Sequence, residues 1–237
     1  MSGAWVVELR TGRSGWIEAI WTFAVGAVGA LLALTVHAVG AAIWRAALVA
    51  ILTATWGLRL GLQIVARTLR SGADSSDRAR IANWGAASPA RLFASLQMQG
   101  LTGAVLATSV VLAAKAPDPH WRVQDFFGAV LLVAALFGQA VANAQRAGFR
   151  AEPANRDKVC DVGLWKLMGR PNDVFEVLAW FAYPVFAIDP TGGDRFGWLA
   201  FAAPAAVGWA MFGRRPTRGS DEPRAPITFP RVRPPTR

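Results

Sequence analysis

Residues 126–145 read FFGAVLLVAALFGQAVANAQ, twenty consecutive positions without a charged side chain. A helix needs about 20 mostly apolar residues to cross the hydrocarbon core of a bilayer, which is roughly 30 Å thick. Only helices and closed barrels satisfy their backbone hydrogen bonds inside lipid. The stretch lacks the alternating pattern of barrel strands, so it predicts a transmembrane helix.

Five further blocks of similar length and composition predict more such helices. They are residues 19–44, 46–66, 92–114, 171–188 and 196–213. Arg59 interrupts one block, and Asp173 and Glu176 interrupt another near its start. Hydrophobic residues make up 54% of the chain and charged residues only 17%, against about 25% charged in soluble domains. The sequence therefore predicts an all-α, polytopic membrane bundle with about six transmembrane helices.

The 237-residue chain has a net charge of +10, and the placement of this charge indicates topology. If six helices cross, twenty Lys and Arg residues fall in segments on one side and four on the other. The positive-inside rule then puts both termini in the cytoplasm. We accordingly expect membrane lipids as partners and no nucleic acid. Residues 1–213 are predicted to form one membrane-embedded domain, and the Pro- and Arg-rich residues 214–237 a poorly ordered cytoplasmic tail.

Polar residues inside a membrane are costly and are therefore the first functional candidates. Gln139 and Asn143 are four residues apart on one helical face, and Arg146 and Arg150 continue roughly that face toward the cytoplasm. Such a stripe could hold the phosphates and ribose of a nucleotide. Alternatively, the amides bond neighbouring helices and the arginines lie in solvent at the membrane edge.

Asn172, Glu176 and Trp180 form a second stripe, at i, i+4 and i+8, directly after Pro171. A helix that begins at Pro171 would offer free N–H groups to an anion. The alternative role of this stripe is helix capping and packing.

Arg59 lies in the middle of a predicted span and must face protein or water. We expect it to pair with Glu176 or Glu18, or to contact a bound anion. Two histidines and a single cysteine cannot by themselves form a metal site, so none is predicted.

Several motifs resemble those of bacterial, uncharacterised membrane proteins related to the steroid 5-alpha-reductases. They are WGLRL at 56–60, ANAQ at 142–145, PANR at 153–156 and GLW at 163–165, followed by Asn172, Glu176 and Trp180. The resemblance covers residues 13 to 212. It implies a helical reductase of the inner membrane that binds NADPH from the cytoplasmic side. Such an enzyme would pass a hydride to an activated C=C bond of a lipid-soluble, steroid-like enone.

The resemblance and the polar pattern together give the candidate site. The candidate catalytic residues are Glu176, which would orient the nicotinamide, and Glu18, a possible acid. The candidate cofactor-binding residues are Arg59, Gln139, Asn143, Arg146, Arg150, Trp165, Arg170, Asn172 and Trp180.

The sequence also departs from the family pattern. Gly169 and Arg170 stand in place of Arg-His, and amides at Gln139 and Asn143 replace carboxylates. These changes leave a non-catalytic relative as one alternative. The same region occurs in isoprenylcysteine-type membrane methyltransferases, which leaves S-adenosylmethionine as an alternative cofactor.

Overall fold

A computed structural model describes residues 15–35, 42–70, 88–115, 120–155, 158–189 and 194–213, and these ranges contain helices and no strand. The all-α prediction is therefore confirmed for them. In chain order the elements are α2 (Gly15–Thr35), α3 (Ile43–Arg70), α5 (Ser88–Ala114), α6 (Val123–Ala151), η3 (Pro153–Asn155), α7 (Leu164–Met168), α8 (Pro171–Ala187), η4 (Gly197–Phe201), α9 (Ala202–Gly208) and η5 (Trp209–Gly213).

Four of the described helices are long and apolar enough to cross a membrane. They are Gly15–Thr35, Ile43–Leu69, Phe93–Ala114 and Val123–Ala151. The apolar block 19–44 does not form one helix, since α2 ends at Thr35 and Trp44 belongs to α3. An apolar run shows which residues can lie in the hydrocarbon core, but it does not mark the residue at which a helix ends. The predicted tail, residues 214–237, lies outside the described residues, as do the basic residues before Gly15.

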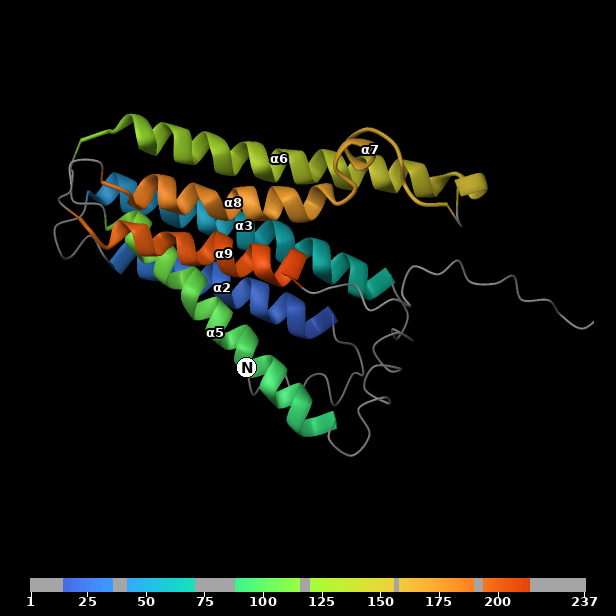
Figure 1. The fold of residues 1–237 in the computed structure, drawn as a ribbon, viewed down its shortest axis with the longest axis horizontal. Coiled ribbons are helices and arrows are strands. Elements are labelled where there is room, and N and C mark those ends of the chain that lie inside the picture. The colour runs from blue at the N-terminus through green and yellow to red at the C-terminus, as the bar shows by residue number, and fades with distance from the viewer. Residues whose placement is uncertain are drawn as a thin grey trace, which may run out of the picture.

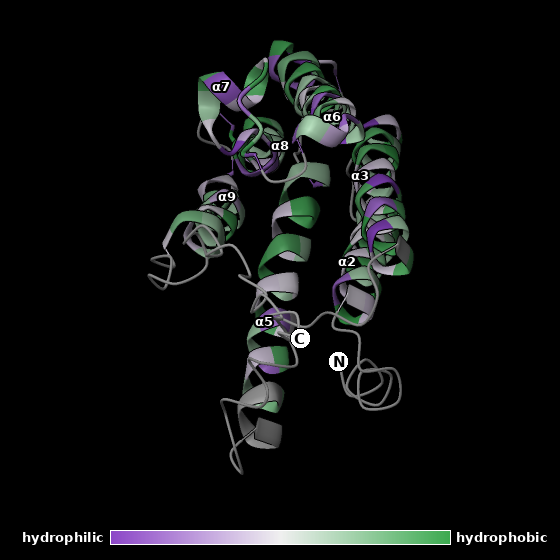
Figure 2. Ribbon diagram, turned by 90° about the vertical axis from the view of Figure 1, so that its right-hand side faces the viewer, coloured by the Kyte–Doolittle hydropathy of each residue, from purple (hydrophilic) through white to green (hydrophobic). Residues whose placement is uncertain are grey.

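The helices lie side by side with their long axes roughly aligned, except that α5 leans outward from the others toward its N-terminal end (Figure 1). The start of α2 and the end of the last helical segment lie at the same end of the bundle. Hydrophobic residues also cover outward-facing parts of the helices (Figure 2), and Leu31 and Phe137 are among those exposed. Exposed apolar faces on long helices fit an integral membrane protein, whose solvent on that side is lipid.

Small residues bring α2 and α3 into close contact. A Cβ atom added at Gly57 would lie 2.7 Å from the Cα atom of Gly26, closer than real Cβ atoms come. Gly29 and Gly61 similarly pack against Thr53 and Phe23. Membrane helices associate through such close van der Waals packing, because lipid gives no hydrophobic drive for helices to meet.

A buried charge cluster joins three helices at the end of the bundle away from the start of α2. Asp125 near the start of α6 accepts hydrogen bonds from Arg45 Nε and Nη2 of α3, both at 3.0 Å, and both side chains are fully buried. Arg122 Nη2 also donates to Asp125 Oδ1, at 3.0 Å, and to the backbone oxygen of Phe186 in α8, at 2.6 Å. This cluster, Arg45, Arg122 and Asp125, fixes α3, α6 and α8 relative to one another.

We predict that Gly57→Ala destabilises the protein, because its new methyl group would push α2 and α3 apart. Overpacking of this kind costs about 1–3 kcal/mol. Thermal unfolding of the detergent-purified protein measures the effect. Gly148→Ala is the matched control, since nothing lies within 4 Å of a Cβ atom there. The control should melt at or slightly above the wild-type temperature, because Ala favours helix over Gly. Equal melting temperatures for both variants would contradict the close contact.

Candidate functional site

Glu176 lies at the centre of a hydrogen-bonded cluster inside the bundle. Its side chain on α8 is buried. Its Oε1 atom accepts hydrogen bonds from the indole Nε1 atoms of Trp56 and Trp180, at 2.9 and 3.0 Å. Its Oε2 atom accepts one from Gln139 Nε2, at 2.8 Å. These donors come from α3, α6 and α8, so one carboxyl group holds three helices together.

Arg59 reaches Glu176 through an amide. Arg59 Nη1 donates to Gln139 Oε1, and Gln139 Nε2 donates onward to Glu176. The sequence predicted Glu176 or Glu18 as a partner of Arg59, and the structure links Arg59 to Glu176 with Gln139 between them. Both hydrogen bonds therefore point the same way, with the acceptor on the side of Glu176. The orientation of the Gln139 amide is therefore determined by the groups on both sides of it.

Asn172 extends the cluster toward the start of α8. Its Nδ2 atom donates to Asn143 Oδ1 at 2.8 Å, and its backbone oxygen accepts a longer bond from Gln139 Nε2 at 3.4 Å. Among the described residues, Asn172 Oδ1 and Gln99 Oε1 are the buried side-chain polar atoms without a hydrogen-bond partner. An unpaired buried acceptor costs free energy, which an N–H or O–H donor on a bound molecule would recover.

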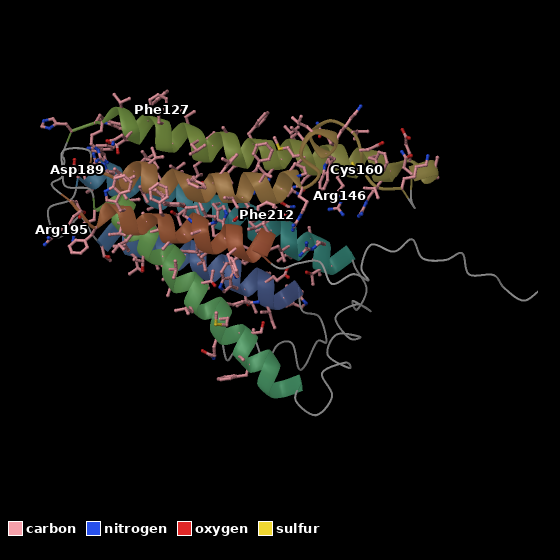
Figure 3. The ribbon with its side chains drawn as sticks, viewed as in Figure 1. Phe127, Arg146, Cys160, Asp189, Arg195 and Phe212 are labelled. Carbon is pink, nitrogen blue, oxygen red and sulfur yellow. The ribbon has the colours of Figure 1, made fainter. Side chains whose placement is uncertain are left out.

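Arg146 and Trp165 lie together where α7 packs beside α6. The Arg146 guanidinium lies over the Trp165 ring, 5.0 Å from its centroid, and Trp165 Nε1 donates to the backbone oxygen of Ala142 at 2.8 Å. Gly163 begins this turn with a φ of +53°, and its Cα faces the Gln145 side chain so closely that a Cβ atom would not fit. Figure 3 shows Arg146 and Cys160 at the end of the bundle away from Asp189 and Arg195. Arg150 is exposed.

Two predicted site residues have other partners. Glu18 Oε2 accepts a hydrogen bond from Arg67 Nη2 at 2.8 Å, and both side chains are exposed. Arg170 is also exposed; it pairs with Asp173 and donates to the backbone oxygen of Met211 at 2.9 Å. Within the part of the chain that the structure describes, no hydrogen bond joins Glu18 or Arg170 to the Glu176 cluster.

One residue of the cluster, Trp56, and one that packs against it, Tyr183, were not among the predicted site residues. Trp56 donates directly to Glu176, and Tyr183 stacks on Trp180 with ring centroids 4.9 Å apart. The Tyr183 hydroxyl lies 3.0 Å from Thr53 Oγ1. A helical-face argument could have found Tyr183, which is seven residues after Glu176 and therefore on the same face of α8.

The sequence matches, over residues 4–213, the family described as "Protein of unknown function (DUF1295)". No curated protein matches the chain, and no solved structure does.

We predict that Glu176→Gln destabilises the protein and that Gln139→Glu combined with it restores most of the loss. In the single variant, two amides meet and at least one buried N–H donor stays unpaired, which costs about 1–3 kcal/mol. In the double variant, Arg59 and the new amide at position 176 would both donate to the new carboxylate at position 139, and both indoles would still find an oxygen. Thermal unfolding of wild type, both singles and the double gives the coupling. If the double variant loses the sum of the stabilities lost by the two single variants, the donor and acceptor assignment between Gln139 and Glu176 is wrong.

Proposed function

This chain belongs to the DUF1295 family, and we propose that it is a membrane-bound, NADPH-dependent reductase of an activated C=C bond in a lipid-soluble, steroid-like enone. The observation that carries the proposal is the continuity of the Glu176 cluster. Arg59, Gln139, Asn143, Asn172 and Trp180, all candidate cofactor residues, are linked to Glu176 by hydrogen bonds across α3, α6 and α8. The resemblance to steroid 5-alpha-reductases supplies the reaction class.

The residues present fit a phosphorylated cofactor with an amide group. Arg146 and Arg150 offer positive charge for phosphate oxygens near the end of α6. Asn172 Oδ1 offers a buried acceptor to an amide N–H. NADPH, when bound, would supply the hydride. S-adenosylmethionine would be the cofactor of a methyltransferase, and a non-catalytic relative would bind neither molecule.

Reduction of an enone also needs a group that donates a hydrogen bond or proton to its carbonyl oxygen. Glu176 accepts three hydrogen bonds and donates none of them, so we assign it to orient the cofactor and not to this role. Tyr183 offers an O–H group beside Trp180, held by Thr53. Glu18, exposed and paired with Arg67, stays a candidate acid from the sequence alone.

We further propose that α8 and residues 197–213 cross as the fifth and sixth spans. Each segment has 17 residues, at the short end of the membrane-spanning range. Helix α8 is about 25 Å long, whereas residues 197–213 join a 3-10 turn, a short α-helix and a π turn. An even number of crossings agrees with α2 and the last segment having their outer ends at the same end of the bundle. The charge distribution favours the cytoplasm for both termini, and the family resemblance favours the bacterial inner membrane.

We predict saturable binding of NADPH to the detergent-purified protein, measured by quenching of its tryptophan emission, and no comparable binding of S-adenosylmethionine. Asn172→Ala should weaken NADPH binding by about tenfold or more, equal to ~1.4 kcal/mol, because it removes the buried acceptor. Gln124→Ala is the matched control, since the Gln124 amide donates to the backbone oxygen of Ile188 at the other end of α6.

Thermal unfolding of both variants checks that they are folded. Equal affinity of wild type and Asn172→Ala would remove Asn172 from the site. Saturable binding of S-adenosylmethionine alone would replace the reductase with a methyltransferase, and binding of neither would favour a non-catalytic relative.

The single cysteine tests the topology. Cys160 lies between α6 and α7, on the side predicted to be cytoplasmic. A membrane-impermeant maleimide should therefore label it only after spheroplasts are permeabilised. The variant Cys160→Ser/Lys115→Cys has its thiol at the other end of the bundle and should be labelled in intact spheroplasts. The reverse pattern would invert the proposed orientation.

A further inference from the structure

Helix α6 is longer than the membrane is thick. Its 29 residues, Val123–Ala151, correspond to about 43 Å, against roughly 30 Å of hydrocarbon. The first twenty residues, 123–142, suffice to cross from the Arg45, Arg122 and Asp125 cluster. The remaining turns contain Asn143, Gln145, Arg146 and Arg150 and therefore belong in the head-group region.

Two hydrogen bonds hold α7 at the level where α6 leaves the hydrocarbon. Trp165 Nε1 donates to the backbone oxygen of Ala142, and the backbone N–H of Leu164 donates to Gln145 Oε1 at 2.9 Å. The chain after α6 thus folds back beside residues 142–145, as the position of α7 along α6 also shows (Figure 1).

Residues 158–168, which we name the interfacial segment, lead into α7 and include it, and they have exposed apolar side chains. Val159 is 88% exposed and Leu167 is 76% exposed, and Val162 is exposed to a smaller degree. Outside the hydrocarbon such side chains would face water, unless something covers them.

Basic residues are adjacent in the sequence to two of these apolar positions. Lys158 and Lys166 are exposed within the interfacial segment, where Asp161 is the only acidic residue. Arg146 and Arg150 are four residues apart at the neighbouring end of α6 and therefore lie on the same face of that helix. Exposed apolar side chains next to exposed lysines, at a membrane boundary, match the head-group region of an anionic bilayer.

We propose that the interfacial segment docks on the cytoplasmic surface of the membrane, with Val159 and Leu167 among the head groups and Lys158 and Lys166 on anionic phospholipids. The segment carries Trp165, whose ring covers Arg146, so anionic lipid stabilises the position of Arg146 as well. This docking does not depend on the proposed reductase activity.

Cys160 provides a reporter within the segment, because it is the only cysteine of the chain. The full chain is labelled there with a nitrobenzoxadiazole maleimide. It is then reconstituted in nanodiscs of phosphatidylcholine alone or with one third phosphatidylglycerol. In the anionic nanodiscs we expect a blue-shifted emission, quenching by doxyl-labelled lipid and severalfold weaker quenching by iodide. High salt should reverse these effects in part, since it screens exposed charges.

The variant Lys158→Gln/Lys166→Gln should lose the response to phosphatidylglycerol, and Leu167→Asn should lose most of the doxyl quenching. Lys115→Gln/Arg195→Gln removes the same charge at the opposite end of the bundle and should respond like wild type. Iodide access that is the same in both nanodiscs would overturn the proposal. So would an equal loss in the control variant, or protection of the label by a second copy of the chain in undiluted samples only.

Discussion

A carboxyl group inside a membrane protein has no water to complete its hydrogen bonds, so the protein must supply each donor. Glu176 receives its donors from Trp56, Gln139 and Trp180, which lie on three different helices. Removal of any donor would leave a buried oxygen under-satisfied. The positions of α3, α6 and α8 relative to one another are therefore coupled through a single side chain. The position of Asn172, which Gln139 connects to Glu176, depends on the same coupling.

The sequence predicts the presence of these helices well, because the rise per residue and the hydrocarbon thickness together fix how long an apolar run must be. It predicts their ends less well. The run 19–44 carries no charge, yet it contains both the end of α2 and the start of α3. No charged side chain marks that boundary, and the residue types near it, Thr35 and Gly40, also occur inside α2 as Thr22 and Gly29.

For the candidate site, the sequence shows which residues share a helical face, but it does not show which residues of other helices contact that face. The spacing of Asn172, Glu176 and Trp180 placed them on one helical face without a structure. The partners of that face could not be read this way, because Gln139 is 37 residues from Glu176 and Trp56 is 120 residues away. Glu18 illustrates the limit: its place in the first span made it a candidate acid, and in the structure it pairs with Arg67.

The two ends of α6 are held in different ways. At Asp125 the helix is fixed by a buried ion pair to Arg45 of α3, whereas beyond Ala142 it continues as a partly exposed helix beside α7. Bilayers differ in thickness by a few ångströms between membranes, and a protein adjusts to such a mismatch where it is least constrained. A thicker bilayer would thus cover more of the Arg146 end while the Asp125 end kept its depth. The exposure of Arg146 to water would then depend on the acyl-chain length of the surrounding lipid.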